Sequence, residues 1–224
     1  MTAPPRLVVF DVDGTLVDSQ DHIHAAMAHA FQTVDTPLPP RAEVLSIVGL
    51  SLPEAVARLV PGLAADVRDA IVTAYKQSFG VLRADKLSPL FPGALEALSG
   101  LRAQSEVLLG VATGKSRRGL SHILDAHDLS GHFVTQQVAD DHPSKPHPSM
   151  LLAALADTGV EPAHAVMIGD TTYDMEMGCS AGFRTVGVAW GYHRAETLRE
   201  AGADEIIGDF AALGPALARI WGMP

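Results

Sequence analysis

The sequence of 224 residues is poor in cysteine, in aromatic residues and in positive charge. Because Cys179 is the single cysteine, the chain has no partner with which to form an internal disulfide. Lys and Arg number 16 against 26 Asp and Glu, so the formal net charge is −10. A charge of this sign disfavours nucleic acid and anionic membrane surfaces as partners.

The sequence also lacks a continuous apolar run of about 18 residues, so we expect no membrane-spanning helix. Its N-terminus, MTAPPRLVVFDVDG, has neither a long apolar stretch nor a small-residue cleavage site. Together with the single cysteine, these features predict a cytoplasmic location. The composition, 47% hydrophobic and 19% charged, is that of an ordinary globular protein.

Short apolar runs recur along the chain, with helix-length amphipathic segments between the later ones. They lie at 7–10, 107–111, 166–168, 186–188 and 206–207. Segment 132–138 is a weaker strand candidate, because polar residues interrupt its apolar positions. The alternation predicts an α/β protein built on a parallel sheet.

One stretch breaks the alternation, because it contains helical patterns and no convincing strand. An apolar stripe at helical spacing runs from Ile23 to Val34, after an N-cap at Asp18 or Ser19, and a second stripe runs from Val67 to Phe79. We therefore predict two domains. A discontinuous α/β core comprises 1–16 and 91–224, and an inserted helical cap comprises 17–90.

Two carboxylates, Asp11 and Asp13, follow the first expected strand and precede Gly14. In a parallel sheet the carboxyl ends of the strands are where ligands bind. Like charges this close need a cation or unequal protonation, and Mg²⁺ prefers carboxylate oxygens. The same letters are equally compatible with a turn that ends a strand.

Three further segments carry polar side chains where a strand gives way to a turn. Thr113 and Gly114 could cradle phosphate at a helix start, or Thr113 could be an ordinary N-cap. Lys145 stands beside Pro146, which limits the backbone freedom around it. Asp170 and Asp174 share a helical face, either to hold a metal or as helix-start acids that the dipole favours.

In this order the four segments resemble the motifs of the haloacid dehalogenase superfamily, and within it the phosphatases with a helical cap. They are 11–19 (DVDGTLVDS), 111–115 (VATGK), 144–148 (SKPHP) and 168–174 (IGDTTYD). The resemblance spans nearly the whole chain. It implies a Rossmann-like core with an all-helical cap, and a magnesium-dependent phosphatase that forms a phospho-aspartate.

The resemblance also implies a role for each residue. Asp11 would attack phosphorus, and Asp13 would protonate the leaving group and then activate water. Phosphate would be bound by Asp11, Thr113, Gly114 and Lys145. Mg²⁺ would be held by Asp11, the backbone carbonyl of Asp13, Asp170 and waters, and Asp174 would either bind the ion or orient one of those waters.

In the cap, segment 49–51 (Gly-Leu-Ser) resembles the substrate-facing loop of related enzymes, and we expect Gly49 and Ser51 to meet the substrate. The expected partner is a small phosphorylated metabolite, phosphoglycolate first, and the expected state is a monomer or homodimer. A sugar-phosphate phosphomutase and a phospho-accepting signalling module remain as alternatives. We place Cys179 in the core, and segment 190–193 either edges the site or packs as a loop.

Overall fold

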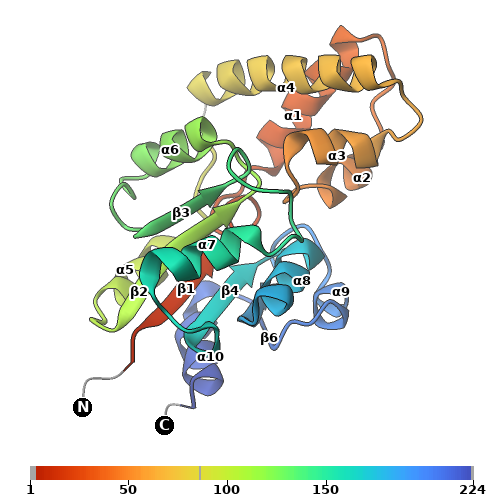
Figure 1. Ribbon diagram of the computed structural model, residues 1–224. Helices are drawn as coiled ribbons and strands as arrows, with labels where there is room; N and C mark the ends of the chain where they lie inside the picture. The colour runs from red at the N-terminus through yellow and green to blue at the C-terminus, as the bar shows by residue number, and fades with distance from the viewer. Residues whose placement is uncertain (1–3, 86, 223–224) are drawn as a thin grey trace.

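The computed structural model describes residues 4–85 and 87–222, and for 80–85 it describes the backbone alone (Figure 1). The predicted domain ranges also include 1–3, 86 and 223–224, which lie outside the described residues. Within the described ranges, no helix is both long enough and apolar enough to cross a membrane.

A six-stranded sheet forms the lower part of the molecule, in the order β3-β2-β1-β4-β5-β6. All five neighbouring pairs are parallel, which confirms the predicted α/β class. The strands are β1 (Arg6–Phe10), β2 (Val107–Thr113), β3 (Thr135–Val138), β4 (Ala165–Gly169), β5 (Arg184–Val188) and β6 (Glu205–Ile207). The weaker candidate at 132–138 forms a strand only in its second half.

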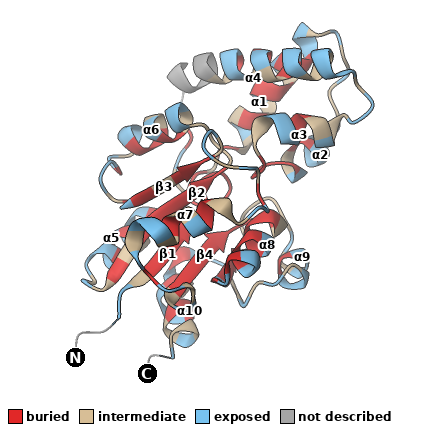
Figure 2. Ribbon diagram, viewed as in Figure 1, coloured by how far each residue is buried: buried red, intermediate tan, exposed pale blue. Residues whose placement is uncertain are grey.

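Helices cover both faces of this sheet. They are α5 (Ala94–Arg102), α6 (Arg117–Ala126), α7 (Ser149–Thr158), α8 (Thr172–Ala181), α9 (Ala195–Glu200) and α10 (Leu213–Ile220), with 3₁₀ turns at Pro162–His164 and Phe210–Ala212. Because side chains alternate along a strand, Val8 and Phe10 join the core under α5, α6 and α10. Leu7 and Val9 join the core under α7 and α8. Figure 2 shows the sheet buried between the two layers.

The helical insertion lies between β1 and β2, as predicted, and begins with α1 (Gln20–Thr33), α2 (Arg41–Ser46), α3 (Leu52–Leu59) and α4 (Ala65–Asp85). These four helices bury a separate apolar cluster that includes Met27, Phe31, Val56 and Ile71. They stand over the carboxyl edge of the sheet (Figure 1). The insertion therefore forms a cap above the strand ends.

The two connections between cap and sheet run side by side. Val17 pairs with Leu90 in an antiparallel bridge, and the Phe91 amide donates to the Leu16 carbonyl at 2.9 Å. These contacts lie at the predicted junctions 16/17 and 90/91. The domain boundaries themselves stay a prediction.

Two local expectations are modified by the structure. Ser19 occupies the N-cap position of α1, but its side chain makes no capping hydrogen bond. Cys179 is exposed, so its predicted core position was wrong. The buried face of α8 passes through Met177, Gly178 and Ala181, which turns the Cys179 side chain outward.

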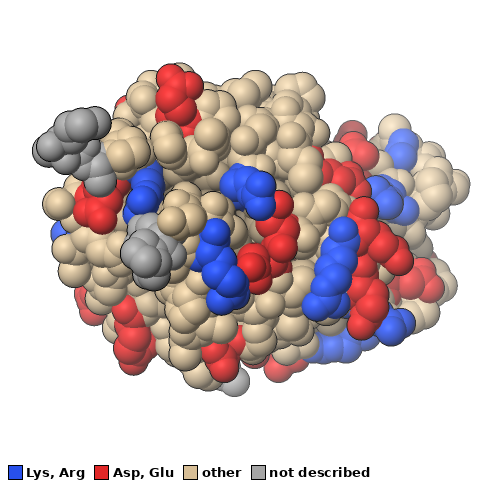
Figure 3. All heavy atoms as spheres, turned by 90° about the horizontal axis from the view of Figure 1, so that it is seen from below, with Lys and Arg blue, Asp and Glu red and all other residues tan. Residues whose placement is uncertain are grey.

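The face turned away from the cap carries basic and acidic side chains that are interspersed rather than gathered by sign (Figure 3). Among the exposed ion pairs of the molecule, Arg219 reaches Glu205 at 2.9 Å and Arg184 reaches Asp204 at 2.8 Å. Exposed pairs of this kind contribute at most about 1 kcal/mol each. Burial in the two layers therefore matters more for the fold.

The cap contacts the core closely at one loop. A Cβ atom on Gly114 would lie 2.5 Å from the Leu50 carbonyl oxygen and 2.7 Å from that of Gly49. The Ser51 amide donates to Ser144 Oγ at 2.8 Å. The strand end at Gly114 therefore needs a residue without a side chain.

We predict that Gly114→Ala lifts the 49–51 loop, because backbone carbonyls cannot give way as flexible side chains do. The free energy of unfolding should fall by about 1–3 kcal/mol. Hydrogen exchange of the Ser51 amide should become at least about tenfold faster. Gly100→Ala is the matched control, since a Cβ there meets open space. Equal Ser51 exchange in both variants would contradict this packing.

Candidate active site

The strand register brings three predicted site residues to one edge of the sheet. Phe10 of β1 pairs with Val111 of β2 and with Ile168 of β4. Asp11, Thr113 and Asp170 follow those positions by one or two residues, so all three lie at the carboxyl ends of adjacent strands. This edge is where parallel sheets bind ligands.

A buried lysine lies between two of the predicted carboxylates. Lys145 Nζ is 2.8 Å from Asp11 Oδ1 and 2.7 Å from Asp174 Oδ1. The exposed fractions of the three side chains are 0% or 1%. Lys145 comes from the segment after β3, and Asp174 comes from the first turn of α8. The pairing of Lys145 with Asp174 was not predicted from the sequence.

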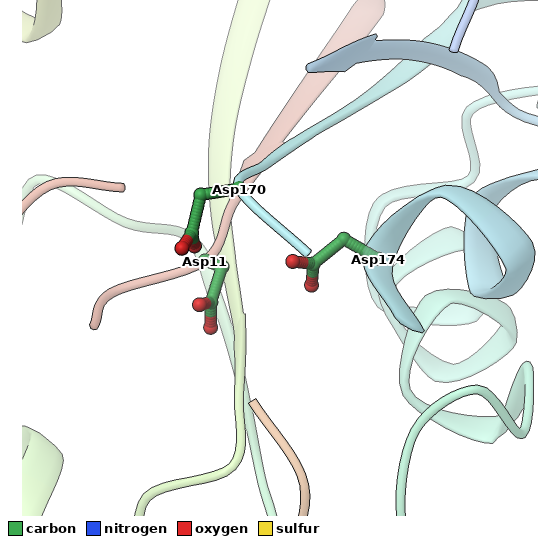
Figure 4. Close-up of side chains that lie close together, drawn as sticks. All are labelled: Asp11, Asp170 and Asp174. Atoms are coloured by element: carbon green, nitrogen blue, oxygen red, sulfur yellow. The ribbon is translucent and has the colours of Figure 1, made fainter. Parts of the chain in front are cut away.

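Three carboxylates converge in the same place (Figure 4). One oxygen from each of Asp11, Asp170 and Asp174 lies within 4.8 Å of the other two. Asp170 is held from outside the triad, because Thr15 Oγ1 donates to it at 2.9 Å and the Tyr192 amide at 2.8 Å. Asp174 is fixed by the Thr171 hydroxyl at 2.7 Å.

The second oxygen of Asp11 has no hydrogen-bond partner among the described residues, although it is buried. A buried, unpaired carboxylate oxygen is costly unless a ligand or cation satisfies it. Here three carboxylates also face one ammonium group. Both observations fit a bound metal ion with oxygen ligands.

Burial and crowding shift the pKa values of these groups. Burial raises the pKa of Asp11 to about 7, opposed by the Lys145 charge and reinforced by Asp174. Burial also raises the pKa of Asp170 well above its usual value, and the charges of Asp11 and Asp174 add to this. Burial would lower the pKa of Lys145, but its two carboxylate partners raise it above the usual range. Three carboxylates thus share one lysine, and without a cation Asp11 and Asp170 retain their protons to higher pH than usual.

Asp13 does not contribute its side chain to this triad. Lys115 Nζ lies 2.8 Å from Asp13 Oδ1, and the Ser19 hydroxyl donates to the same oxygen. The Tyr192 hydroxyl is 3.2 Å from Ser19 Oγ. The two acids of the first motif therefore pair with two different lysines.

Thr113 is completely buried at the end of β2, and its Oγ1 accepts a hydrogen bond from the Lys115 amide at 3.2 Å. It does not cap α6, because Ser116 is the N-cap there and accepts from Gly119 at 3.2 Å. The alternative that Thr113 is an ordinary N-cap is therefore wrong. Gly114 lies directly beneath the cap loop.

A cavity of about 630 Å³ lies between the cap and the core and has Asp13 in its wall. Gly49 and Gly114 line it together with Lys115, whereas Ser51 does not. The Ser51 amide is instead engaged with Ser144. The structure therefore brings one of the two predicted cap residues to this cavity.

Three contributors were missed or left open by the sequence. Lys115 was quoted in its motif but received no role, although a lysine next to a phosphate cradle is a usable signal. Thr15 carried no signal beyond its motif. Segment 190–193 edges the site, because Tyr192 contacts Asp170 through its amide and Ser19 through its hydroxyl.

Comparisons with known proteins agree with this geometry. The family described as haloacid dehalogenase-like hydrolase matches residues 8–188. The probable phosphatase IndB of Dickeya dadantii is 35% identical over 92% of this chain and 90% of its own length. The phosphoglycolate phosphatase of Nitrosococcus oceani is 29% identical over 92% of this chain and 94% of its own length.

A solved structure shares the whole architecture. It is a crystal structure described as a predicted phosphoglycolate phosphatase from Haemophilus somnus, with a TM-score of 0.86 and 25% identity. The match covers 96% of this chain and 99% of that one, so cap and core are both included.

We predict that the Asp11 carboxyl makes the stability of the metal-free protein fall as pH rises. Its pKa of about 7 in the fold exceeds the usual 3.8, so the folded state binds more protons between these values. The stability that Asp11 contributes is complete below about pH 4 and is lost towards pH 7. Urea unfolding in chelator should show wild type losing stability relative to Asp11→Asn across this window, with a slope of up to about 1.4 kcal/mol per pH unit.

If the free energy of unfolding of wild type and of Asp11→Asn changes with pH in the same way between pH 4 and 7, the raised pKa of Asp11 is contradicted.

Proposed function

We propose that this chain, which belongs to the haloacid dehalogenase-like hydrolase family and is a phosphatase, cleaves a phosphomonoester through a covalent phospho-aspartate on Asp11, with Mg²⁺ as its cofactor. One observation carries the proposal. Asp11 holds one oxygen against Lys145, and its other oxygen is buried without a partner among the described residues. A carboxylate fixed in this way is positioned to bind an electrophile or a cation.

Magnesium fits the donor set, because it is a hard ion that is bound by carboxylates and by substrate phosphate. Asp11, Asp170 and Asp174 would hold it, together with the backbone carbonyl of Asp13. When bound, the ion would supply positive charge that offsets the carboxylates and polarises the phosphoryl oxygens. Lys145 adds a fixed positive charge from the chain itself.

In the first step, an Asp11 oxygen attacks phosphorus, and the bond from phosphorus to the alcohol oxygen breaks. Asp13 gives its proton to that oxygen, so the alcohol leaves neutral. In the second step, Asp13 takes a proton from water as the water attacks the phospho-aspartate. Inorganic phosphate leaves, and both acids return to their starting states.

The phosphoryl oxygens would meet Lys145, the Thr113 hydroxyl and the amide of Gly114 at the strand ends. Such donors stabilise charge that develops in the transition state. Ser19 and Lys115 hold the Asp13 carboxyl at the cavity wall, whereas Lys145, which pairs with Asp11, does not line the cavity. The two acids can therefore act on opposite sides of the transferred group.

Phosphoglycolate is the first compound to test as substrate, because a relative that matches 92% of this chain is named for it. Other small phosphorylated metabolites belong to the same class. In the cap, Gly49 would meet the substrate from the cavity wall. Ser51 lies outside the cavity lining and would meet the substrate only after its amide leaves Ser144.

We predict that Asp11→Asn lowers phosphatase activity by at least about 10³-fold, because an amide cannot form the acyl phosphate. Phosphate release from phosphoglycolate, sugar phosphates and 4-nitrophenyl phosphate should require Mg²⁺ and stop in chelator. The melting curve of the variant serves as the control for folding. Turnover that survives in Asp11→Asn, or in chelator, would contradict the proposal.

We predict that Asp13→Asn affects esters unequally. The loss should be about 10²–10⁴-fold for an alkyl phosphate, whose leaving oxygen needs a proton. It should be clearly smaller for 4-nitrophenyl phosphate, because nitrophenolate leaves without one. The ratio of the two kcat/KM losses is the measurement, and an equal loss for both esters would remove Asp13 as the general acid.

A further inference from the structure

We propose that the substrate is a phosphomonoester whose alcohol carries a flat ring, carbocyclic or heterocyclic, which occupies the cavity between cap and core. The inference rests on the proposed function, since it concerns the alcohol half of the same ester. It goes further because it assigns a chemical class to that half.

The cavity lies on the alcohol side of the site. Asp13, the residue that meets the leaving oxygen, is in its wall, and Lys115 and Gly119 continue that wall along the core. Asp11 and Lys145 are not among its lining residues. A phosphoryl group bound at Lys145 would therefore direct its alcohol into the cavity.

The size of the cavity exceeds what a two-carbon alcohol fills. Its volume is about 630 Å³. Pockets of roughly 300–1,000 Å³ commonly bury ligands of drug size. With glycolate bound, most of this space would hold water.

The cap side of the cavity is largely apolar, although Lys76 and Gln77 of α4 also line it. It is lined by Ile23 and Met27 of α1, Ile47 after α2, and Leu52 and Ala55 of α3. All of these except Leu52 are buried in the fold. Water beside such a wall finds few polar partners, so an apolar group gains free energy by replacing it.

Two aromatic rings on α4 favour a flat group in particular. Tyr75 and Phe79 line the cavity one helical turn apart, with ring centroids 5.6 Å apart and an angle of 20° between the planes. Lys115 Nζ lies 5.1 Å from the centre of the Phe79 ring. A further ring can stack in this arrangement, because offset aromatic pairs are stable at such spacings.

The alcohol part of phosphoglycolate carries a carboxylate. The cavity offers this group fewer favourable contacts than it offers a flat ring. Lys115 is the cation beside Asp13, and it is already paired with Asp13 at 2.8 Å. Lys76 and Arg118 also line the cavity, but both residues are exposed. A solvated cation gains little from an additional partner.

The test compares kcat/KM for benzyl phosphate, ethyl phosphate and phosphoglycolate with Mg²⁺ present. All three release an alkyl alcohol, so a difference between them reports the leaving-group site more than intrinsic reactivity. We expect kcat/KM for benzyl phosphate to exceed that for ethyl phosphate by at least about tenfold, because burying several apolar carbons in the cavity stabilises the transition state by that amount. A benzyl-to-ethyl ratio within about twofold of one, or a higher kcat/KM for phosphoglycolate, would overturn the inference.

Two variants connect the preference to this cavity. Ala55→Phe fills it and Phe79→Ala removes a stacking ring, and each should bring the benzyl-to-ethyl ratio towards one. Ala70→Phe is the matched control, because Ala70 is exposed on α4 and does not line the cavity. If Ala55→Phe does not fold, the benzyl-to-ethyl ratios of wild type and of Phe79→Ala still test the inference.

The outcomes also separate the two proposals. Magnesium-dependent release from ethyl phosphate or phosphoglycolate, without a benzyl preference, would overturn the inference and leave the proposed function intact. No release from any of the three esters by folded protein would overturn both.

Discussion

The pairing of Lys145 with Asp11 and Asp174 is the interaction on which the rest of the site depends. Burying an ammonium group and a carboxylate away from water costs several kcal/mol for each ion, and only close pairing offsets this. Here both carboxylates contact the same nitrogen, at 2.8 Å and 2.7 Å. Asp170 stands beside them, so three carboxylates share one ammonium group. The same arrangement that keeps the fold intact leaves a position for a cation.

Close packing around these carboxylates explains the backbone that surrounds them. A Cβ atom on Gly14 would lie 2.2 Å from Asp170 Oδ2, and one on Gly191 would lie 2.1 Å from the Asp170 Cβ. Any side chain at either position would collide with the triad. The turn after β1 and the loop after β5 can therefore approach Asp170 only as glycine, and Tyr192 can then reach both Asp170 and Ser19.

Local signals made much of the structure predictable. The spacing of apolar residues indicated the strands and the helical insertion, and the position of the motif residues at strand ends indicated that they converge. Partners far along the chain were not predictable: Thr15 and Asp170 are 155 positions apart, and only the strand order brings them together. Cys179 was misplaced because α8 is apolar on more than one side, so its pattern does not select a buried face. The size and lining of the cavity depend on how α1, α3 and α4 lie over the sheet, which no short segment encodes.

The central claim is that Asp11 carries the phosphoryl group between substrate and water. The most direct test is a rapid acid quench during turnover, followed by borohydride reduction, which converts an aspartyl phosphate to homoserine, and by peptide mass mapping. The account predicts homoserine at position 11 in turning-over wild-type enzyme and unmodified aspartate there when substrate is omitted. Conversion at another carboxylate, or steady turnover with position 11 unmodified at every quench time, would contradict it.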